Sequence, residues 1–470
     1  MPKSTAKSAH PSATKSEKTS KPAHAANPGH RAKPTAAGKG SHGHQPAHGS
    51  SPTHAHKPVH TAQPGKGKKQ PTGKAAAAGQ PIFNQPAPSP DPTSFKDPVT
   101  DQSDQELNNL EPVPQPTGGA VEPVLTLEQV YGSNGASITQ TITTAGQIVF
   151  HSVGDTGSVK GPSSQNQVAD KMASDFTEAN AADVPSFFYH LGDVVYYFGE
   201  GSYYYDQFYE PYRNYPAPIL GIPGNHDGVV WDSDPAPTLQ AYLRNFCTSA
   251  AAQSPDSGGL VRTTMIQPGV YYTFDVPFVR ILGVYSNVLE DPGVISGQNG
   301  TYSTLDQRQV QFLTAALQRI KSEKYAGAVI IATHHPAFTG GSNHGGSPDM
   351  LADIDSACTA AGVWPHAVLA GHAHNYQRYT RTVNGLTIPF IVAGCGGHSP
   401  LESLSSTLRT PYPIDATLTL ESYDDKDYGY LRIIVNATTL TIEFHPASDG
   451  STTKTPDDTV TVTLATHAVS

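Results

Sequence analysis

Residues 186–196 read SFFYHLGDVVY, and in them a short apolar run ends abruptly at Gly192 and Asp193. Apolar runs of this length, bounded by glycine and polar residues, are typical of buried parallel strands. Four other runs end in the same way, in residue types that bind metal ions. The crevice beyond the carboxyl ends of such strands is the usual ligand site of an open α/β sheet, so we expect a metal centre there. The five endings are GDTG at 154–157, GDVVY at 192–196, GNHD at 224–227, HHP at 334–336 and GHAH at 371–374.

The first two endings have the spacing of one strand–helix–strand unit. Asp155 and Asp193 lie 38 residues apart, and apolar residues between them recur every three or four positions over Gln165–Ala181, which predicts a helix. A right-handed crossover would place both carboxylates at the same edge of the sheet. Two cations about 3.5–4 Å apart need a shared anionic ligand between them. We therefore expect a dinuclear centre in which Asp193 bridges the two ions.

The other candidate ligands divide by their chemistry. Aspartate and tyrosine oxygens suit a hard trivalent ion, whereas an asparagine carbonyl and imidazoles suit a divalent ion. The His-x-His spacing of His372 and His374 lets a single turn reach both ions. His190 and His335, by contrast, are expected to be hydrogen-bonded core residues, because buried polar groups are usually satisfied in that way.

The order of these endings resembles that of the calcineurin-like metallophosphoesterases and, among them, the purple acid phosphatases. The resemblance covers roughly residues 146–446 and rests on the motifs GD-x-G, GD-x-x-Y, GNH-D/E, a histidine two residues before proline, and GH-x-H, which are all present. It implies an α/β fold with four layers, α/β/β/α, and a centre of Fe(3+) with a divalent ion, which is Fe2+, Zn2+ or Mn2+. Tyr196 is the discriminating residue, because tyrosinate bound to iron colours the purple enzymes. The implied ligands are Asp155, Asp193, Tyr196 and His374 for the ferric ion, and Asp193, Asn225, His334 and His372 for the divalent ion.

The same resemblance implies an acid phosphatase that hydrolyses phosphate monoesters, with a phosphorylated small molecule or a phosphoprotein as substrate. A metal-bound hydroxide would attack phosphorus while both cations neutralise the phosphate oxygens. His226 would protonate the leaving alkoxide, Asp227 would orient His226, and His344 would be a second histidine outside the ligand set. His398 falls where relatives have a loop close to the substrate. Two alternatives stay open: a phosphodiesterase acting on nucleotides or phospholipid headgroups, and a polyanion-binding protein acting through its basic tail.

Charge is divided unevenly along the 470 residues. Residues 1–80 contain 12 Lys, one Arg and one Glu, a net charge of +12, and because the whole chain carries −10, the remainder carries −22. Residues 1–80 also lack aromatic residues, so they cannot bury enough apolar surface to offset the entropy of ordering. We expect a disordered, solvated tail whose like charges repel one another. The alternative is an arm that makes a weak, salt-dependent contact with nucleic acid or an acidic membrane.

Composition divides the rest of the chain into three parts. We expect a proline-rich linker at 81–144 with a short strand at Ser137–Thr143. A catalytic domain is expected at 145–446, followed by a C-terminal strand or tail at 447–470. The linker is too short for the N-terminal β-sandwich of the large plant-type enzymes, so the chain is closer to the small single-domain type. Other expected elements are helices at Tyr203–Tyr215 and Leu305–Glu323 and a long loop or lid at 228–266.

The sequence gives few signs of export or membrane insertion. No apolar segment follows Lys3 and Lys7, so a secretory signal is not expected and the default location is cytoplasmic, with export by another route still open. No apolar stretch approaches the ~20 residues of a membrane span. The three cysteines are too few for a disulfide framework and are expected to be mostly free, buried thiols.

Overall fold

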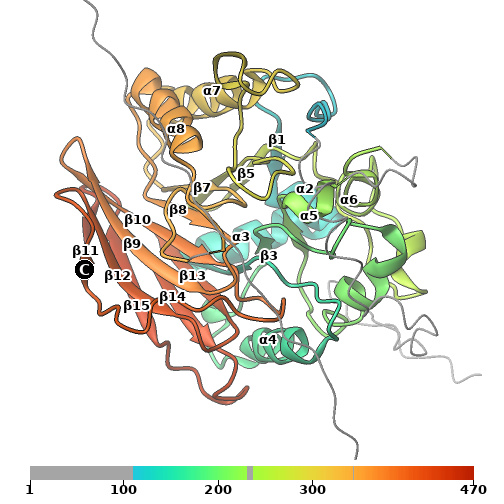
Figure 1. Ribbon diagram of the computed structural model, residues 1–470. Coiled ribbons are helices and arrows are strands. Elements are labelled where there is room, and N and C mark those ends of the chain that lie inside the picture. The colour runs from blue at the N-terminus through green and yellow to red at the C-terminus, as the bar shows by residue number, and fades with distance from the viewer. Residues whose placement is uncertain (1–109, 230–236, 342) are drawn as a thin grey trace, which may run out of the picture. The chain divides into compact units, whose positions relative to one another are not determined.

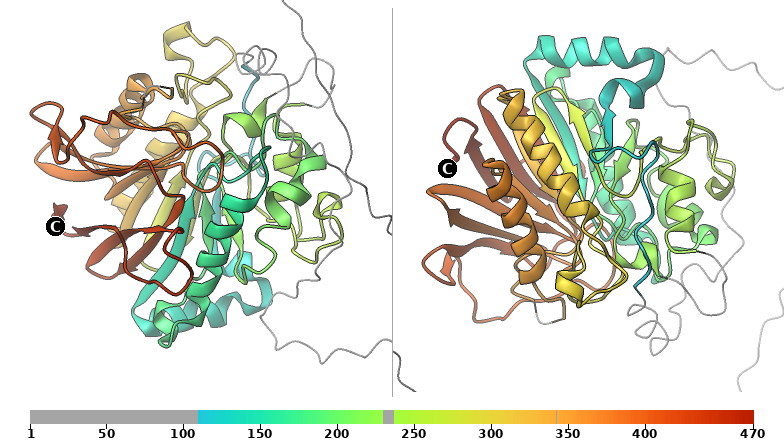
Figure 2. Two further views of the ribbon diagram at one scale, coloured as in Figure 1. Left: turned by 60° about the horizontal axis from the view of Figure 1, so that its bottom comes forward. Right: turned by 90° about the horizontal axis from the view of Figure 1, so that it is seen from above.

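The computed structural model of the protein describes residues 110–229, 237–341 and 343–470. They form two β-sheets with helices on the outer faces, as Figures 1 and 2 show. This is the four-layer α/β/β/α arrangement that the resemblance implies.

The first sheet has nine strands and combines parallel and antiparallel pairs. Its parallel part contains β6, β7, β8 and β10, whereas β9, β12 and β11 continue it in antiparallel pairing. In spatial order the strands are β1 (Val124–Thr126), β5 (Tyr272–Val276), β6 (Val279–Gly283), β7 (Ala328–Ala332), β8 (Ala367–Ala370), β10 (Leu386–Ala393), β9 (Tyr376–Val383), β12 (Leu418–Asp424) and β11 (Tyr412–Pro413).

The second sheet has seven strands, and its parallel part is the run β2, β3 and β4. The other strands join it through antiparallel pairs that begin at β2 and β13. In spatial order the strands are β16 (Ala468–Val469), β15 (Asp458–Thr463), β14 (Thr439–Pro446), β13 (Gly429–Asn436), β2 (Gln147–Val153), β3 (Phe188–His190) and β4 (Ile219–Gly221).

The alternation of side chains along each strand builds the layers. In β3, Tyr189 points into the core between the sheets, while its neighbour Phe188 packs in the core beneath the helices. Ile330 and Ile331 of β7 divide in the same way. Because both faces of these strands are buried, their sequences are apolar throughout, as is usual for parallel strands between helices and a second sheet.

Helices cover the outer faces of both sheets. α4 (Ser163–Ser174) packs on the second sheet, and α7 (Arg308–Ser322) and α8 (Pro348–Ala361) pack side by side on the first. α7 buries Phe312, Leu313, Ala316, Leu317 and Ile320, the three-to-four-residue spacing of one helical face. The shorter helices are α2 (Leu127–Tyr131), α3 (Gly135–Ala145), α5 (Asn225–Gly228) and α6 (Gln240–Phe246).

The structure corrects several expected elements. The strand expected at Ser137–Thr143 is wrong, because these residues form helix α3, whose Ile138 and Ile142 lie four positions apart and pack against the core between the sheets. Residues 124–126 of the expected linker form β1. Residues 458–463 form β15 inside the second sheet, which agrees with the strand that was one of the two alternatives for 447–470. In place of a helix over Tyr203–Tyr215 there is a π-helical turn at Tyr205–Tyr209, followed by turns.

The expected loop at 228–266 contains helix α6, while residues 230–236 of it lie outside the described residues. The tail expected at 1–80, with its polyanion contact, also lies outside them. In the part of the chain that the structure describes, no helix is long and apolar enough to cross a membrane.

Candidate metal centre

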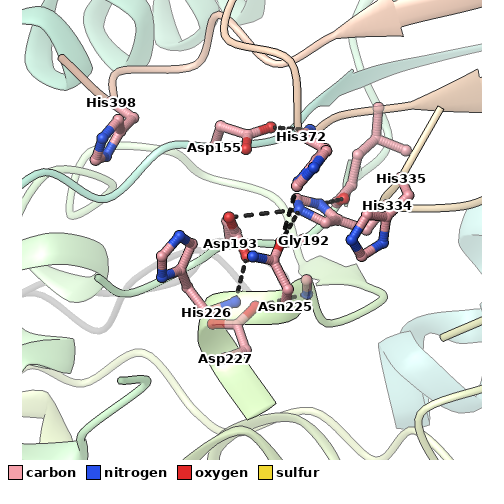
Figure 3. A network of polar contacts seen from close by, with 12 residues as sticks. Asp155, Gly192, Asp193, Asn225, His226, Asp227, His334, His335, His372 and His398 are labelled. Atoms are coloured by element: carbon pink, nitrogen blue, oxygen red, sulfur yellow. Dashed lines mark hydrogen bonds and ion pairs between the residues drawn. The ribbon is translucent and has the colours of Figure 1, made fainter. Parts of the chain in front are cut away.

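The expected ligands meet where the carboxyl ends of both sheets' parallel strands face each other. Figure 3 shows Asp155, Asp193, Asn225, His334 and His372 converging from separate segments of the chain. Three segments belong to the second sheet and two to the first. The residues after β2, β3 and β4 supply Asp155, Asp193, Tyr196 and Asn225, and those after β7 and β8 supply His334, His372 and His374.

One group of donor atoms surrounds the phenol oxygen of Tyr196. This oxygen lies 2.9 Å from Asp193 Oδ2, 3.1 Å from Asp155 Oδ1 and 3.3 Å from His374 Nε2. All four side chains are buried or nearly so. The group is the set expected for the trivalent ion.

A second group shares Asp193 with the first. His334 Nε2 lies 2.9 Å from Asn225 Oδ1 and 3.4 Å from Asp193 Oδ2, and His372 Nδ1 lies 3.1 Å from the same Asn225 oxygen. His334 Nδ1 donates to the carbonyl of Leu191 at 2.8 Å, which directs Nε2 toward the carboxylate. Asp155, Asp193 and His334 each offer an atom within 4.8 Å of the others. The structure thus brings all seven expected ligands together, with Asp193 between the two groups.

The backbone is strained at three of these positions. Asp155, Asp193 and His372 have φ angles of 57°, 56° and 69°, in the left-handed region that side-chain-bearing residues seldom adopt. Each such residue costs on the order of 1 kcal/mol. Strain of this kind persists where the surrounding structure enforces it and gathers at functional sites.

The residues fit a pair of cations. The glycines of the motifs leave the space that the donors occupy. A Cβ at Gly224 would lie 2.1 Å from Asp193 Oδ1, and one at Gly371 would lie 2.6 Å from Asp155 Oδ2. Glycine is therefore required at these two positions by the close approach of the backbone to the donor atoms.

Without bound cations, the negative charges at this site outweigh the positive ones. Burial raises the pKa of Asp155 to about 7, with Asp193 adding to the rise and His334 opposing it. Burial would also raise the pKa of Asp193, but His334 and His226 hold that pKa well below its usual range. Burial would lower the pKa of His334, yet Asp193 and Asp155 raise it to about 9. One imidazolium therefore faces two buried carboxylates, and further positive charge would stabilise the group.

His226 borders the site, but its orientation differs from the expectation. Its ring Nδ1 donates to the carbonyl of Tyr197 at 2.8 Å, which leaves Nε2 available to a ligand. Asp227, which was expected to orient His226, instead accepts hydrogen bonds from the backbone N–H groups of Gly224 and Val194 at 2.9 and 3.0 Å. Asp227 thus fixes the backbone around Asp193. The carbonyl of Tyr197, and not Asp227, orients the ring of His226.

His344 lies beside the centre, with its ring centroid 4.6 Å from that of His372 and 4.8 Å from that of His374. Two carboxylates flank it: Glu402 Oε2 is 3.0 Å from Nδ1 and Glu290 Oε1 is 3.5 Å from Nε2. Burial would lower the pKa of His344, but these two partners raise it to about 10. The sequence analysis missed both glutamates, because they come from loops with no motif of their own.

Three further histidines lie around the ligands. His335 bonds to Ser286 Oγ and to the carbonyl of Leu289, and His190 bonds to Thr156 Oγ1, so both are hydrogen-bonded core residues as expected. His398 is also buried, and its ring lies against Tyr196.

Two family models match the chain. Residues 150–376 match the calcineurin-like phosphoesterases, and residues 389–454 match the iron/zinc purple acid phosphatase-like protein C. The protein belongs to the calcineurin-like metallophosphoesterases and, within them, to the purple acid phosphatase-like family. Membership implies a phosphoric ester hydrolase with a dinuclear metal centre, typically of iron and zinc.

Several solved structures are similar to the chain at low identity. GAP50, the anchor in the inner membrane complex of Plasmodium, is 15% identical, with 68% of this chain and 89% of that chain covered and a TM-score of 0.46. PhoD is 11% identical, with 69% and 71% covered and a TM-score of 0.41. A putative 5'-nucleotidase from Staphylococcus aureus is 13% identical, with 66% and 56% covered and a TM-score of 0.31. No curated protein matches the sequence.

Proposed function

We propose that this protein hydrolyses phosphate monoesters at a centre of one ferric ion and one divalent ion, either Fe2+, Zn2+ or Mn2+. The observation that carries the proposal is the position of Tyr196. Its phenol oxygen lies within 3.3 Å of atoms of Asp155, Asp193 and His374, so three oxygen donors and one nitrogen converge on one point. Burial and the two carboxylates raise the pKa of this phenol well above its usual range, and a trivalent cation would reverse that effect.

The ligands follow from the two groups of donors. Asp193, which belongs to both groups, would be shared by the two ions. When bound, such a pair of cations neutralises the phosphate oxygens and lowers the pKa of water at the site. The proposed ligands are Asp155, Asp193, Tyr196 and His374 for the ferric ion and Asp193, Asn225, His334 and His372 for the divalent ion.

Outside the ligands, the histidines bind and move protons. Because the carbonyl of Tyr197 can only accept, His226 carries its proton on Nδ1 and turns Nε2 toward the substrate. His226 Nε2 is therefore the atom that would donate a proton to the leaving alkoxide once the imidazole has been protonated. His344, held beside His372 by Glu290 and Glu402, is the second histidine outside the ligand set.

The preference for monoesters is supported by the ligand set with Tyr196, which is that of the purple acid phosphatases. The test compares kcat/KM for an aryl phosphate monoester and the matching diester, using the protein purified with iron. We expect the monoester to be preferred by at least about tenfold, a difference of about 1.4 kcal/mol in the barrier. A preference for the diester would show that the protein is a phosphodiesterase rather than a monoesterase.

The presence of a ferric ion is tested separately, by the visible absorption spectrum. We expect a broad visible band in the oxidised protein, and we expect Tyr196→Phe to abolish it, because phenylalanine keeps the ring but lacks the oxygen. Partial activity should survive, since Asp155, Asp193 and His374 can still hold a divalent ion. If the wild-type protein is colourless and holds two equivalent divalent ions after iron has been supplied, the proposal of a ferric ion is refuted. The proposal of a hydrolase would still stand.

A further inference from the structure

A glycine-rich segment after β10 is hydrogen-bonded along the loop that carries Asp155. The N–H of Gly154 donates to the carbonyl of Ala393 at 2.9 Å, and the N–H of Gly396 donates back to Gly154 at 3.1 Å. The N–H of His398 then donates to the carbonyl of Asp155 at 2.8 Å. These three bonds fix the backbone of His398 relative to the backbone of Asp155.

The close packing of this segment leaves little freedom. A Cβ at Gly394 would lie 2.2 Å from the carbonyl oxygen of Ala373 and 2.9 Å from Asp155 Oδ2. Gly397 has a φ of +155°, and a Cβ there would lie 2.5 Å from the carbonyl oxygen of Thr156. Because only glycine fits at these two positions, the segment can run directly against the metal loop and deliver a side chain there.

The side chain that it delivers is the imidazole of His398, which covers one face of Tyr196. The two ring centroids are 3.8 Å apart with an angle of 33° between the planes, and the centroid of His374 lies 4.5 Å from that of His398. His398 Nδ1 donates to the carbonyl of Gly157 at 3.1 Å, which fixes the ring in its plane. Tyr196 is fully buried, and His398 is 5% exposed.

Tyr196 has a second ring neighbour on the chain. The centroid of His226 lies 4.4 Å from that of Tyr196, and Figure 3 shows His226 and His398 reaching the same side of Asp193 from different segments. His226 is already assigned to proton transfer, whereas His398 has no role in the proposed reaction. The ring nearest to that of His398 belongs to Tyr196, a proposed metal ligand.

We propose that His398 is a positioning residue that holds the phenol of Tyr196 in the orientation needed to bind the ferric ion and keeps water away from its oxygen. The inference rests on the proposed function, because it requires Tyr196 to be a ligand. Tyr196 has two side-chain torsions, and ring packing on its face restricts both. Without the His398 ring, the phenol gains rotational freedom and solvent reaches its oxygen. The expected consequences are a weaker bond to iron and an altered tyrosinate band.

The test uses the full-length, iron-loaded protein and two substitutions that separate the ring from the hydrogen bond. His398→Phe keeps a ring over Tyr196 but cannot bond to Gly157, whereas His398→Gln keeps an N–H donor but has no ring. We expect the Gln variant to shift or weaken the visible band and to lose iron to a ferric chelator about tenfold faster than the wild type. The Phe variant should keep the band and release iron at nearly the wild-type rate.

A matched control removes a stacked histidine elsewhere. His467 stacks on His366 with centroids 4.3 Å apart, and His467→Gln should leave the band and the iron release unchanged.

The outcomes separate this inference from the proposed function. If His398→Gln shows the same visible band as the wild type, the inference about His398 is overturned and the proposed iron stands. Equal damage in both His398 variants would also overturn it, because a ring without the hydrogen bond would then fail to hold Tyr196. If the Gln variant does not fold, the Phe variant decides: loss of its band refutes the inference, and retention supports it. A wild type without any band instead refutes the proposed iron.

Discussion

One polar cluster is built around the buried carboxylate of Asp175 and another around those of Asp155 and Asp193, and the two are neutralised in opposite ways. Asp175, at the end of α4, is 1% exposed. Its carboxylate accepts hydrogen bonds from His151 Nε2 at 3.0 Å and Tyr430 OH at 2.6 Å and forms an ion pair with Lys454. Burial would raise the pKa of Asp175, but His151 and the other partners hold it well below its usual range.

The pair Asp155 and Asp193 is equally buried, and its partners are Tyr196, His334 and backbone N–H groups rather than a lysine. Among the described residues, no lysine or arginine forms an ion pair with either carboxylate, and the pKa of Asp155 rises to about 7. The chain therefore completes one cluster with its own cation and leaves the other to be completed by ions from outside. The difference predicts that the same change, carboxylate to amide, has opposite effects on the two clusters.

The largest effect is expected for Asp193→Asn. Losing the bridging charge removes the only ligand common to both donor groups, so both ions should be weakened together and turnover should fall about 1000-fold, or about 4 kcal/mol in the barrier. Metal analysis after gel filtration and steady-state kinetics measure the two quantities. Two tightly held ions with normal turnover in this variant would refute the dinuclear assignment.

Asp175→Asn should destabilise the protein whether or not metals are bound. The amide loses the ion pair with Lys454 and part of the bonding to His151 and Tyr430, which should lower the free energy of unfolding by about 3 kcal/mol at pH 7. Because the folded-state pKa of Asp175 lies below the value of about 4 in an unfolded chain, its contribution is complete above about pH 4. It is lost as the pH falls further, so the wild type and variant should converge there.

Urea denaturation at pH 7 and pH 3 measures this difference. Asp170→Asn, on the exposed face of the same helix, is the matched control and should change the free energy of unfolding by less than about 0.5 kcal/mol. An Asp175 variant as stable as this control at pH 7 would mean that the cluster contributes nothing.

Asp155→Asn should have the opposite sign in the metal-free protein. Since the folded-state pKa of Asp155 is raised to about 7, the metal-free wild type binds this proton more tightly when folded, and its stability falls as the pH rises from about 4 to about 7. The amide carries no charge, so the metal-free variant should be more stable than the metal-free wild type at pH 8, by about 1–2 kcal/mol after the loss of one hydrogen bond.

The comparison requires chelated samples of both proteins at pH 5 and pH 8. The advantage of the variant should vanish at pH 5, where the wild-type carboxyl is protonated. With metals present the sign should reverse, because the variant loses a ligand. A metal-free variant less stable than the wild type at pH 8 would show that hydrogen bonds to His372 and Tyr196, not charge, dominate at Asp155.

Much of this centre could be predicted from the sequence, because the residues that mark each ligand are its neighbours in the chain. Each ligand directly follows a short apolar run, so the strand and its ending are read together, and the order of the endings identifies the family. Where local pattern and packing disagree, the prediction fails. Ser137–Thr143 is rich in β-branched residues, which favour a strand, yet the spacing of Ile138 and Ile142 fits a helix that buries one face.

The partners of the site residues could not be predicted, since they arrive from distant loops. Glu402 reaches His344 from 58 residues away, and the Tyr197 carbonyl that orients His226 is a backbone atom without a sequence signal. The assignment of Asp227 to His226 was wrong for the same reason: adjacency in sequence does not fix which hydrogen bond a carboxylate makes. The cluster at Asp175 joins residues from α4, β2, β13 and the C-terminal region, and no motif marks it.

The smallest effect is expected for Tyr430→Phe, which removes one donor from the cluster that the chain completes by itself. His151 and Lys454 still bond to Asp175, so the cost should be about 1 kcal/mol in the free energy of unfolding. It should be the same with and without metals and should leave the visible spectrum unchanged. Tyr196→Phe, the matching change at the other cluster, should instead abolish the band, and its cost should depend on whether ions are bound. His151 lies on β2 and Asp155 just after that strand, so the measurement also tests coupling between the clusters. If chelation changed the cost of Tyr430→Phe by more than about 0.5 kcal/mol, the two clusters would have to be treated as one network.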